Sequence, residues 1–263
     1  MANLPVTDMN LQTRQEIILE TLRRDGKIRV ADFSSQSGVS AVTIRKDLDR
    51  LEQEGLLLRV HGGAISAPIA RNEHNYNERR SYKKAEKQLI AKAVSRLVKD
   101  GESILINVGT TSEYVIDELK SKQDLIVITN ALPILERLNY CENITTFFLG
   151  GRFETNMQIM IGENVIEQLS RYSPDKLIMG MDGVDPIQGL TSRNHVEDYI
   201  MRQMLTQSRE KILVVDDSKI GSSSLMHVCD VSEFDTLVTN YCPEKEELLR
   251  AIEKKGVKVI IAK

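Results

Sequence analysis

The chain has 263 residues, enough for one large domain or for a small domain followed by a larger one. Its formal net charge of −3 excludes a protein that coats nucleic acid through overall positive charge, so any DNA contact requires a local patch. Three unevenly spaced cysteines suggest neither a disulfide framework nor a zinc site. With no apolar run of membrane-spanning length and no secretory pattern, the sequence predicts a cytoplasmic protein, and we expect no metal and no cofactor.

The first part of the chain has helical periodicity. Between residues 11 and 55, apolar residues recur at three- and four-residue steps, which is typical of helices with one buried face. Gly26 would end a first helix, a turn over residues 37–40 would follow a short helix, and Ser40 would cap a third helix. A short strand over residues 56–60 then leads into a glycine turn. This order predicts a winged helix-turn-helix over residues 11–66, preceded by a flexible segment over residues 1–10.

The helix after Ser40 has the composition of a recognition helix, which contacts base edges chiefly through its N-terminal residues. Arg45 suits a bidentate pair with guanine, and Ala41 or the Thr43 methyl suits a thymine methyl. Nine Lys and Arg stand against eight Asp and Glu in residues 11–61, so charge alone leaves a merely solvated helix open. Lys46 and Arg50 suit phosphates. The predicted DNA contacts are Ser40, Ala41, Thr43, Arg45, Lys46, Arg50, Arg59, His61 and Gly62.

The run Ser40-x-x-Thr43-Ile44-Arg45-Lys46-Asp47-Leu48, followed by His61-Gly62-Gly63-Ala64, closely resembles the N-terminal signature of DeoR-type bacterial transcriptional regulators. The resemblance implies sequence-specific binding of a double-stranded DNA operator. Asp47 is unusual because it places an acid in a helix that faces DNA. We expect it to orient Arg45 or Lys46, or to pair with a neighbouring helix.

Residues 67–84 lack a regular pattern and predict a linker, whose closing basic cluster could meet DNA phosphates but is more often solvated. A helix is predicted over residues 85–99. Beyond it, short apolar runs alternate with helical stretches, which predicts a mostly parallel α/β sheet with helices on both faces over residues 85–263. The predicted strands are residues 104–108, 125–129, 145–149, 177–179, 212–215, 237–238 and 257–261.

Glycine and polar residues follow several of these strands. Gly109-Thr110-Thr111 opens a helix directly after a strand, an arrangement that favours a phosphate, although a simple helix cap is the alternative. Ligands of open parallel sheets bind outside the carboxyl ends of the strands. Lys219 could supply a cation there, and acidic side chains could receive sugar hydroxyls. The predicted effector contacts are Gly109, Thr110, Thr111, Thr129, Asn130, Gly150, Gly151, Asp182, Asp185, Glu197 and Lys219.

These segments, in this order, also resemble the C-terminal domain of DeoR-type regulators, which is similar to ribose-5-phosphate isomerase. The resemblance implies that residues 109–111 match its phosphate loop, and that Asp182-Gly183-Val184-Asp185, Glu197 and Asp216-x-Ser218-Lys219 match its active-site segments. This chain departs from the family pattern at Asn107 and after Glu197, which points to an atypical ligand. It also has no counterpart of the isomerase's catalytic-lysine segment. We therefore expect binding without turnover, and no enzymatic activity.

The sequence thus predicts a DNA-binding transcriptional regulator, with a repressor of a carbohydrate-utilisation operon that responds to a phosphorylated sugar as the leading hypothesis. An activator would have the same sequence features. A palindromic operator implies a homo-oligomer that is at least a dimer. Two alternatives stay open: a sugar-phosphate isomerase fused to a DNA-binding domain, and a winged helix that binds protein.

Overall fold

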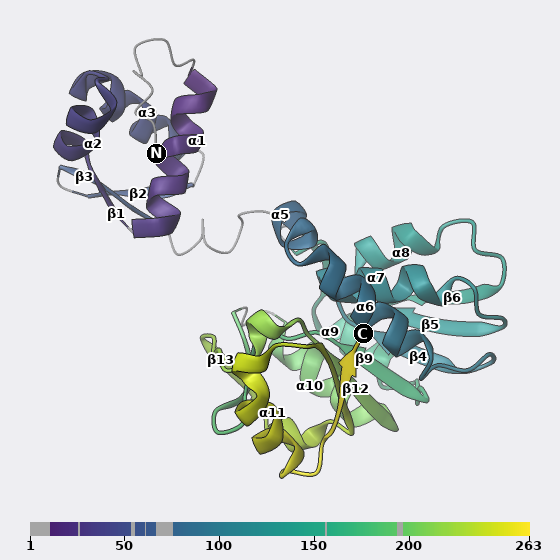
Figure 1. The fold of residues 1–263 in the computed structure, drawn as a ribbon. Coiled ribbons are helices and arrows are strands. Elements are labelled where there is room, and N and C mark those ends of the chain that lie inside the picture. Colours follow the sequence, from purple (N-terminus) through teal and green to yellow (C-terminus); the bar gives the residue numbers. More distant parts are fainter. Residues whose placement is uncertain are drawn as a thin grey trace. The chain divides into compact units, whose positions relative to one another are not determined.

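A computed structural model describes residues 11–263, except residues 26, 54–55, 61, 67–75, 156 and 194–196. The chain divides into two compact units, Met1–Glu78 and Arg79–Lys263 (Figure 1). The predicted flexible start, the predicted helix end at Gly26 and the first half of the predicted linker lie outside the described residues. The predicted limits of the linker, residues 67–84, stay a prediction.

The N-terminal unit contains three helices and a small antiparallel sheet. Its elements are α1 (Leu11–Asp25), β1 (Lys27–Arg29), α2 (Val30–Ser37), α3 (Ala41–Gln53), β2 (Leu57–Val60) and β3 (Gly63–Ser66), with strand order β1-β3-β2. The helices and the β2–β3 hairpin confirm the predicted winged helix-turn-helix. Strand β1 was not predicted, because three residues are too few to show a period and their partner strand is distant in sequence.

One hydrophobic core holds this unit together. It takes side chains from all three helices and from the sheet, so each helix buries one face. Its fully or almost fully buried members include Ile18, Leu22, Ile44, Leu48, Leu51 and Leu57. Gly38 ends α2 in the left-handed region (φ 69°), where its N–H donates to the Ser34 carbonyl. The turn then delivers the chain to the start of α3.

The C-terminal unit is built on a seven-stranded sheet in which every neighbouring pair is parallel. The strand order is β15-β14-β12-β9-β4-β5-β6. These strands are the seven predicted from the apolar runs, with ends that differ by at most two residues. Their bounds are β4 (Ser103–Ile106), β5 (Leu125–Thr129), β6 (Ile144–Phe148), β9 (Lys176–Met179), β12 (Glu210–Val214), β14 (Thr236–Asn240) and β15 (Lys258–Ala262).

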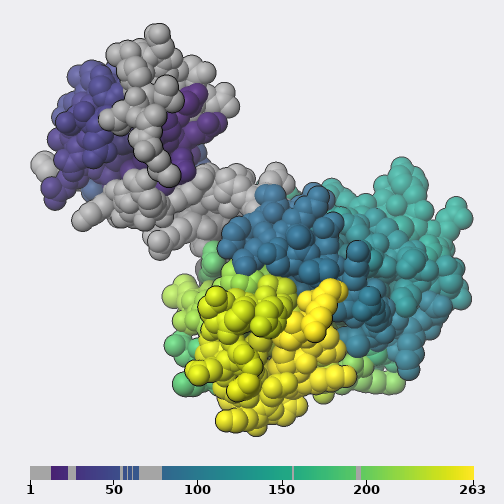
Figure 2. Space-filling model, viewed as in Figure 1, coloured from purple at the N-terminus to yellow at the C-terminus, as the bar shows by residue number. Residues whose placement is uncertain are grey.

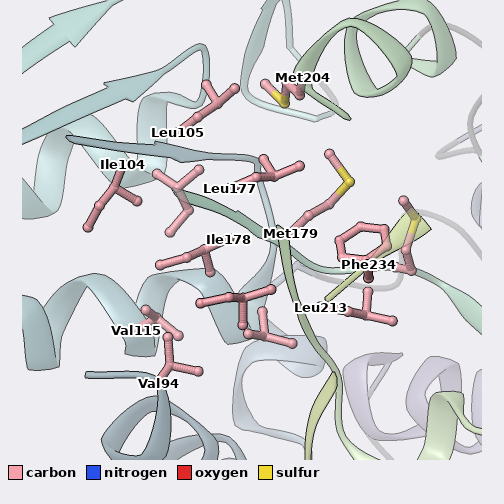
Figure 3. Packing of buried hydrophobic residues seen from close by; sticks show 14 of the residues in the cluster. Val94, Ile104, Leu105, Val115, Leu177, Ile178, Met179, Met204, Leu213 and Phe234 are labelled. Atoms are coloured by element: carbon pink, nitrogen blue, oxygen red, sulfur yellow. The ribbon is translucent and has the colours of Figure 1, made fainter. Parts of the chain in front are cut away.

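Helices cover both faces of this sheet. They are α6 (Lys84–Ser95), α7 (Thr110–Leu119), α8 (Leu132–Leu138), α9 (Glu163–Leu169), α10 (Asp198–Gln207) and α11 (Glu246–Glu253), with single turns η2 (Asp217–Lys219), η3 (Val231–Glu233) and η4 (Pro243–Lys245). The short helix α5 (Tyr76–Ser81) precedes them in the chain. In Figure 3, Val94 of α6 and Val115 of α7 lie on one side of the sheet residues, and Met204 of α10 lies on the other. Helix α6 packs against α7, β14 and β15, and its blue surface adjoins the yellow C-terminal surface in Figure 2.

Several short elements differ from the prediction. Two small antiparallel sheets, β7 (Arg152–Glu154) with β8 (Ile159–Ile161), and β10 (Gly183–Asp185) with β11 (Gly189–Ser192) and β13 (Met226–Cys229), occupy segments for which no strand was predicted. Helix α5 lies within the predicted linker, where the Lys87 ammonium binds carbonyls at and just after its C-terminal end. Helix α6 ends at Ser95, four residues before the predicted end. Tertiary contacts decide these elements, because none has enough residues for a period.

Candidate functional sites

Helix α3 has a strictly divided surface. Its buried side chains are Ile44, Asp47, Leu48 and Leu51, and its exposed ones include Val42, Arg45, Lys46, Asp49 and Arg50. The exposed set recurs at three- and four-residue steps and therefore forms one stripe along the helix. Arg45 and Lys46 lie on it as predicted. Val42, 59% exposed one turn earlier, was missed, although its spacing from both cations was visible in the sequence.

Ser40 and Thr43 use their polar groups to start this helix. The Thr43 N–H donates to the Ser40 Oγ at 3.1 Å, and the two hydroxyl oxygens lie 2.8 Å apart. This confirms the predicted cap at Ser40. The stripe from Val42 to Lys46 is consequently the most exposed part of the N-terminal half of α3, while Ala41 and Thr43 are half-buried.

Asp47 pairs with a neighbouring helix. Its two carboxylate oxygens accept hydrogen bonds from the Arg14 Nε at 2.5 Å and from the Arg14 Nη2 at 3.0 Å, and Asp47 is only 3% exposed. The hydrogen bond to Asp47 raises the pKa of the Arg14 guanidinium. Of the two expectations for Asp47, pairing across helices is confirmed. This bidentate contact fixes α1 against α3.

The hairpin after α3 is tied back to that helix. The Arg59 Nε donates to the Asp49 Oδ1 at 2.9 Å, its backbone N–H donates to the Glu52 Oε1 at 2.8 Å, and its Nη1 donates to the Gly63 carbonyl. Arg59 therefore has partners within its own unit, and a DNA contact by it stays a prediction. Gly62 is exposed with φ 78°, a conformation that favours glycine, and His61 lies outside the described residues.

The side on which the chain adds strands to the C-terminal sheet changes between β4 and β9. From β4 the chain adds β5 and β6 on one side, and then crosses to add β9, β12, β14 and β15 on the other. The connections that follow two such strands run to opposite faces of the sheet, here to α7 after β4 and to α10 after β9, and parallel sheets bind ligands in the crevice between such connections. Gly109-Thr110-Thr111 follows β4, and Asp182 follows β9, so both segments belong to this crevice. Helix α7 begins at Thr110, with its N-terminal N–H groups at the same edge.

Asn107 holds these two strand ends together. Its Oδ1 accepts the Gly180 N–H at 3.0 Å and its Nδ2 donates to the Gly180 carbonyl at 3.2 Å. The Ser112 hydroxyl donates to the same Oδ1 at 3.4 Å. Buried Thr129 donates to the Ile106 carbonyl at 2.9 Å, which joins β5 to β4 in the same way. The departure from the family pattern at Asn107 thus has a structural role, which spacing alone did not reveal.

Other predicted effector residues also have structural partners. Gly150 exchanges two hydrogen bonds with the Gln168 side chain, and a Cβ on Gly151 would lie 2.6 Å from the Ile161 carbonyl oxygen. The Asn130 Nδ2 donates to the Met160 carbonyl at 2.8 Å. The Asp185 Oδ1 accepts the N–H groups of Ile187 and Gln188, at 2.8 Å each. An effector contact by Asn130, Asp185 or either glycine stays a prediction.

Asp182, Glu197 and Lys219 form one electrostatic cluster. Glu197 is 4% exposed, and no hydrogen-bond partner reaches its Oε1 among the described residues. Burial, reinforced by the charge of Asp182, raises the pKa of Glu197 to about 8. Burial lowers the pKa of Lys219, while Asp216 and Asp182 oppose that change. These long-range effects bring together Asp182 from the segment after β9, Glu197 directly before α10, and Lys219 of η2, which the sequence could only assign to separate segments.

Two arginines that sequence reasoning missed flank Asp182. The Arg79 Nη1 and the Arg193 Nε each lie 4.0 Å from the Asp182 Oδ1, and the Arg193 N–H donates to Oδ2 at 3.1 Å. Lys87 is a third missed cation. It is buried, burial lowers its pKa to about 8, and its Nζ donates to the carbonyls of Arg79 and Tyr82. For Arg79 the sequence signal was the basic run at residues 79–84, which was interpreted as solvated or as facing DNA; Lys87 and Arg193 lie outside that run.

Two family models match the chain in the order of its two units. A DeoR-like helix-turn-helix domain matches residues 14–69, and a DeoR C-terminal sensor domain matches residues 82–241. The chain belongs to the DeoR family of transcriptional regulators. Its N-terminal unit is therefore a helix-turn-helix domain of this family, and its seven-stranded unit is the sensor domain.

Relatives of this DeoR-family chain match along almost their whole length. The putative aga operon transcriptional repressor of Escherichia coli O157:H7 is 30% identical over 250 residues, covering 94% of this chain and 93% of the relative. The lactose phosphotransferase system repressor of Streptococcus mutans is 33% identical over 245 residues, covering 91% and 96%. A ribose-5-phosphate isomerase in complex with phospho-erythronic acid aligns with a TM-score of 0.39 at 18% identity, covering 52% of this chain and 53% of that chain.

The charged groups around Asp182 in this DeoR-family sensor unit have the chemistry to pair with an anion and with hydroxyls. The cations Lys219, Arg79 and Arg193 act electrostatically with the acids Asp182 and Glu197, and α7 begins after the neighbouring strand β4. At neutral pH a Glu197 carboxyl with a pKa of about 8 is largely protonated and can donate a hydrogen bond. Within the described ranges, no group of acids, histidines and cysteines could hold a metal ion, and no helix has the length and apolar character needed to cross a membrane.

Proposed function

We propose that this DeoR-family regulator represses an operon for the uptake or use of a carbohydrate, and that a phosphorylated sugar in the sensor unit changes its affinity for operator DNA. The matched relatives bear the names of an aga operon repressor and a lactose phosphotransferase system repressor, which supports a carbohydrate operon. The proposed protein acts in the cytoplasm as a homo-oligomer that is at least a dimer, because helix-turn-helix proteins read two half-sites with two copies.

The observation that carries the effector proposal is the mixed-charge crevice at the switch between β4 and β9. A phosphate would take the N–H groups and hydroxyls of Gly109, Thr110 and Thr111 at the start of α7, with Lys219 as a cation. Sugar hydroxyls would donate to Asp182 and accept from protonated Glu197. Coupling between two sites is typically worth about 1–3 kcal/mol, which corresponds to a roughly 5- to 150-fold change in DNA affinity.

On the DNA side, the exposed stripe of α3 would enter the major groove. Arg45 would donate two hydrogen bonds to a guanine, and Lys46 would meet a phosphate. Ser40 shapes the start of this helix through its cap and could reach a phosphate itself. The stripe is exposed over the first two turns of α3, where recognition helices make their base contacts.

We further propose that the sensor unit binds its sugar phosphate without converting it. The crevice retains counterparts of the isomerase acids at Asp182 and Glu197, while the chain has no segment matching the catalytic lysine. Incubation of the full chain with D-ribose 5-phosphate should therefore yield no D-ribulose 5-phosphate. Steady conversion that disappears in Glu197→Gln would contradict this part of the proposal.

The regulatory proposal is tested on a DNA duplex selected in vitro with the full chain. Fluorescence anisotropy would measure its affinity with and without D-glucose 6-phosphate, D-fructose 6-phosphate, D-ribose 5-phosphate or glycerol 3-phosphate, each beside its unphosphorylated counterpart. At least one phosphate ester should change DNA affinity at least fivefold, and Lys219→Ala should abolish that change while retaining basal DNA binding. An unphosphorylated sugar that acts as strongly as its ester would overturn the phosphate requirement.

A further inference from the structure

We infer that Arg79 is a ligand of the effector anion, and that Asp182 holds the Arg79 guanidinium until that anion binds. The inference rests on the proposed function, because it assumes an anionic effector in the crevice of the sensor unit. It adds a binding residue that lies outside the strand-end segments, at the point where the chain enters the sensor unit.

The ion pair between Arg79 and Asp182 is longer than the pairs Arg14–Asp47 and Arg137–Glu113, and its arginine is more exposed. The Nη1 to Oδ1 distance is 4.0 Å, and the Arg79 side chain is 45% exposed. The pairs Arg14–Asp47 and Arg137–Glu113, whose carboxylates are buried, each reach 2.5 Å. Asp182 moreover stands between two arginines, with the Arg193 Nε also 4.0 Å from the same oxygen. The carboxylate therefore neutralises two cations without engaging the Arg79 side chain closely.

A phosphate group would engage Arg79 more completely than Asp182 does. A guanidinium has five N–H donors in a fixed fork that matches the oxygens of a phosphate, and such charge-assisted bidentate pairs are the strong ones. A phosphate monoester also carries more negative charge near neutral pH than one carboxylate. An anion between Arg79, Arg193 and Lys219 would thus replace Asp182 as the partner of Arg79.

The charge of Arg79 already acts on the rest of the crevice. It opposes the raised pKa of Glu197 and contributes to the lowered pKa of Lys219. The guanidinium consequently shares one site with both side chains, although 140 residues separate Arg79 from Lys219 in sequence. This agrees with the distance of 4.0 Å between the Arg79 Nη1 and the Asp182 Oδ1, since Asp182 lies in the same cluster.

The backbone around Arg79 is fastened to the sensor unit. The Lys87 Nζ donates to the Arg79 carbonyl and to the Tyr82 carbonyl, and the Tyr114 hydroxyl donates to the Arg80 carbonyl at 3.1 Å. The Lys83 Nζ lies 2.6 Å and 2.7 Å from the two carboxylate oxygens of Asp217, two residues before Lys219. Arg79 is the first residue of the sensor unit. A change of its binding partner therefore takes place where the chain passes from the N-terminal unit into the sensor unit.

The first experiment measures the binding of inorganic phosphate to the full chain by isothermal titration calorimetry. Arg80→Ala is the matched control, because Arg80 is the next residue, is equally 45% exposed, and directs its Nε to Glu113 at 3.3 Å. Arg79→Ala should weaken phosphate binding by about 10- to 100-fold, the usual effect of losing hydrogen bonds to a charged group. Arg80→Ala should change it less than twofold. Thermal unfolding of both variants verifies that they are folded.

A second variant tests the role of Asp182 in the opposite direction. Asp182→Asn releases Arg79 and removes a negative charge, so it should tighten phosphate binding severalfold. In the double variant with Arg79→Ala most of that gain should disappear. Unchanged or weaker phosphate binding by Asp182→Asn would overturn the claim that Asp182 competes with the anion.

The outcomes separate this inference from the proposed function. If Arg79→Ala binds phosphate like the wild type while Lys219→Ala does not, Arg79 is not a ligand and the proposed effector site stands. Equal losses in Arg79→Ala and Arg80→Ala would also overturn the inference, because the loss would then reflect general charge. If the wild type binds neither inorganic phosphate nor any ester of the DNA-binding assay, both proposals fail.

Discussion

The two units of this chain each contain a carboxylate that faces arginine, but the two ion pairs differ in distance and exposure. Asp47 is buried and bound by two short hydrogen bonds from Arg14, whereas Asp182 is partly exposed and stands 4.0 Å from each of two arginines. A satisfied buried pair holds a domain together, because breaking it leaves a charge without compensation. A loose, accessible pair costs little to open, so it can exchange partners with a ligand.

The largest effect should distinguish these two acids by stability. Asp47→Ala removes a buried carboxylate that accepts two hydrogen bonds from half-buried Arg14, and it should destabilise the N-terminal unit by about 3 kcal/mol. Asp182→Asn should change stability by less than about 1 kcal/mol, as for exposed pairs. Chemical denaturation of both variants, followed by circular dichroism, measures the difference. Equal destabilisation by the two substitutions would show that Asp47 and Asp182 do not differ in their contribution to stability.

The protonated acid beside Asp182 should give the sensor unit a distinctive pH dependence. The pKa of Glu197 is raised to about 8 in the folded chain, so between its ordinary value and 8 the folded state holds a proton that the unfolded state lacks. Stability should therefore fall as pH rises through this window, by at most about 1.4 kcal/mol per pH unit. Glu197→Gln should remove that slope.

Thermal unfolding at intervals from pH 5 to 9 would measure the pH effect of Glu197. Glu163→Gln, on the exposed first turn of α9, is the matched control and should retain the wild-type slope. A Glu197→Gln variant whose unfolding temperature still falls as steeply as that of the wild type would show that another group holds the proton.

Arg45 is exposed as Arg79 is, but its expected partner is DNA. Arg45→Ala should weaken binding to the selected duplex by about 1–3 kcal/mol and relax the preference at one base pair. Quantitative binding to a library of single-base variants of that duplex measures both effects. A uniform loss across all variants would instead assign Arg45 to a phosphate.

The smallest effect concerns Val42, whose exposed methyl groups suit the methyl of a thymine. Replacing that thymine by deoxyuridine should weaken wild-type binding by about 1 kcal/mol, close to the free energy of one buried methylene. In Val42→Ala the replacement should have almost no effect. Val60→Ala, which removes another exposed valine of the same unit, should retain the wild-type penalty. If Val42→Ala still loses affinity when that thymine is replaced by deoxyuridine, Val42 does not contact the thymine methyl.

Local patterns were sufficient for much of the fold. The apolar runs predicted the seven strands of the parallel sheet, and the helical periodicity predicted α1, α2 and α3. Such elements follow from the sequence because burial on one or both faces imposes a period of 3.6 residues or a continuous apolar run. Strands β1, β7, β8, β10, β11 and β13 were not predicted, because three or four residues cannot show a period.

The side-chain partners were decided by the tertiary structure. The sequence by itself determined the family signature, the exposed cations of α3 and the polar ends of the strands, since each is a short run with its own pattern. It did not determine that Asp47 binds Arg14, that Arg59 turns back to Asp49, or that Arg79 and Lys87 belong with the sensor crevice. The contacts of Asp47 and Arg79 join residues 33 and more than 100 positions apart, and only the packing of helices on the sheet brings those residues together.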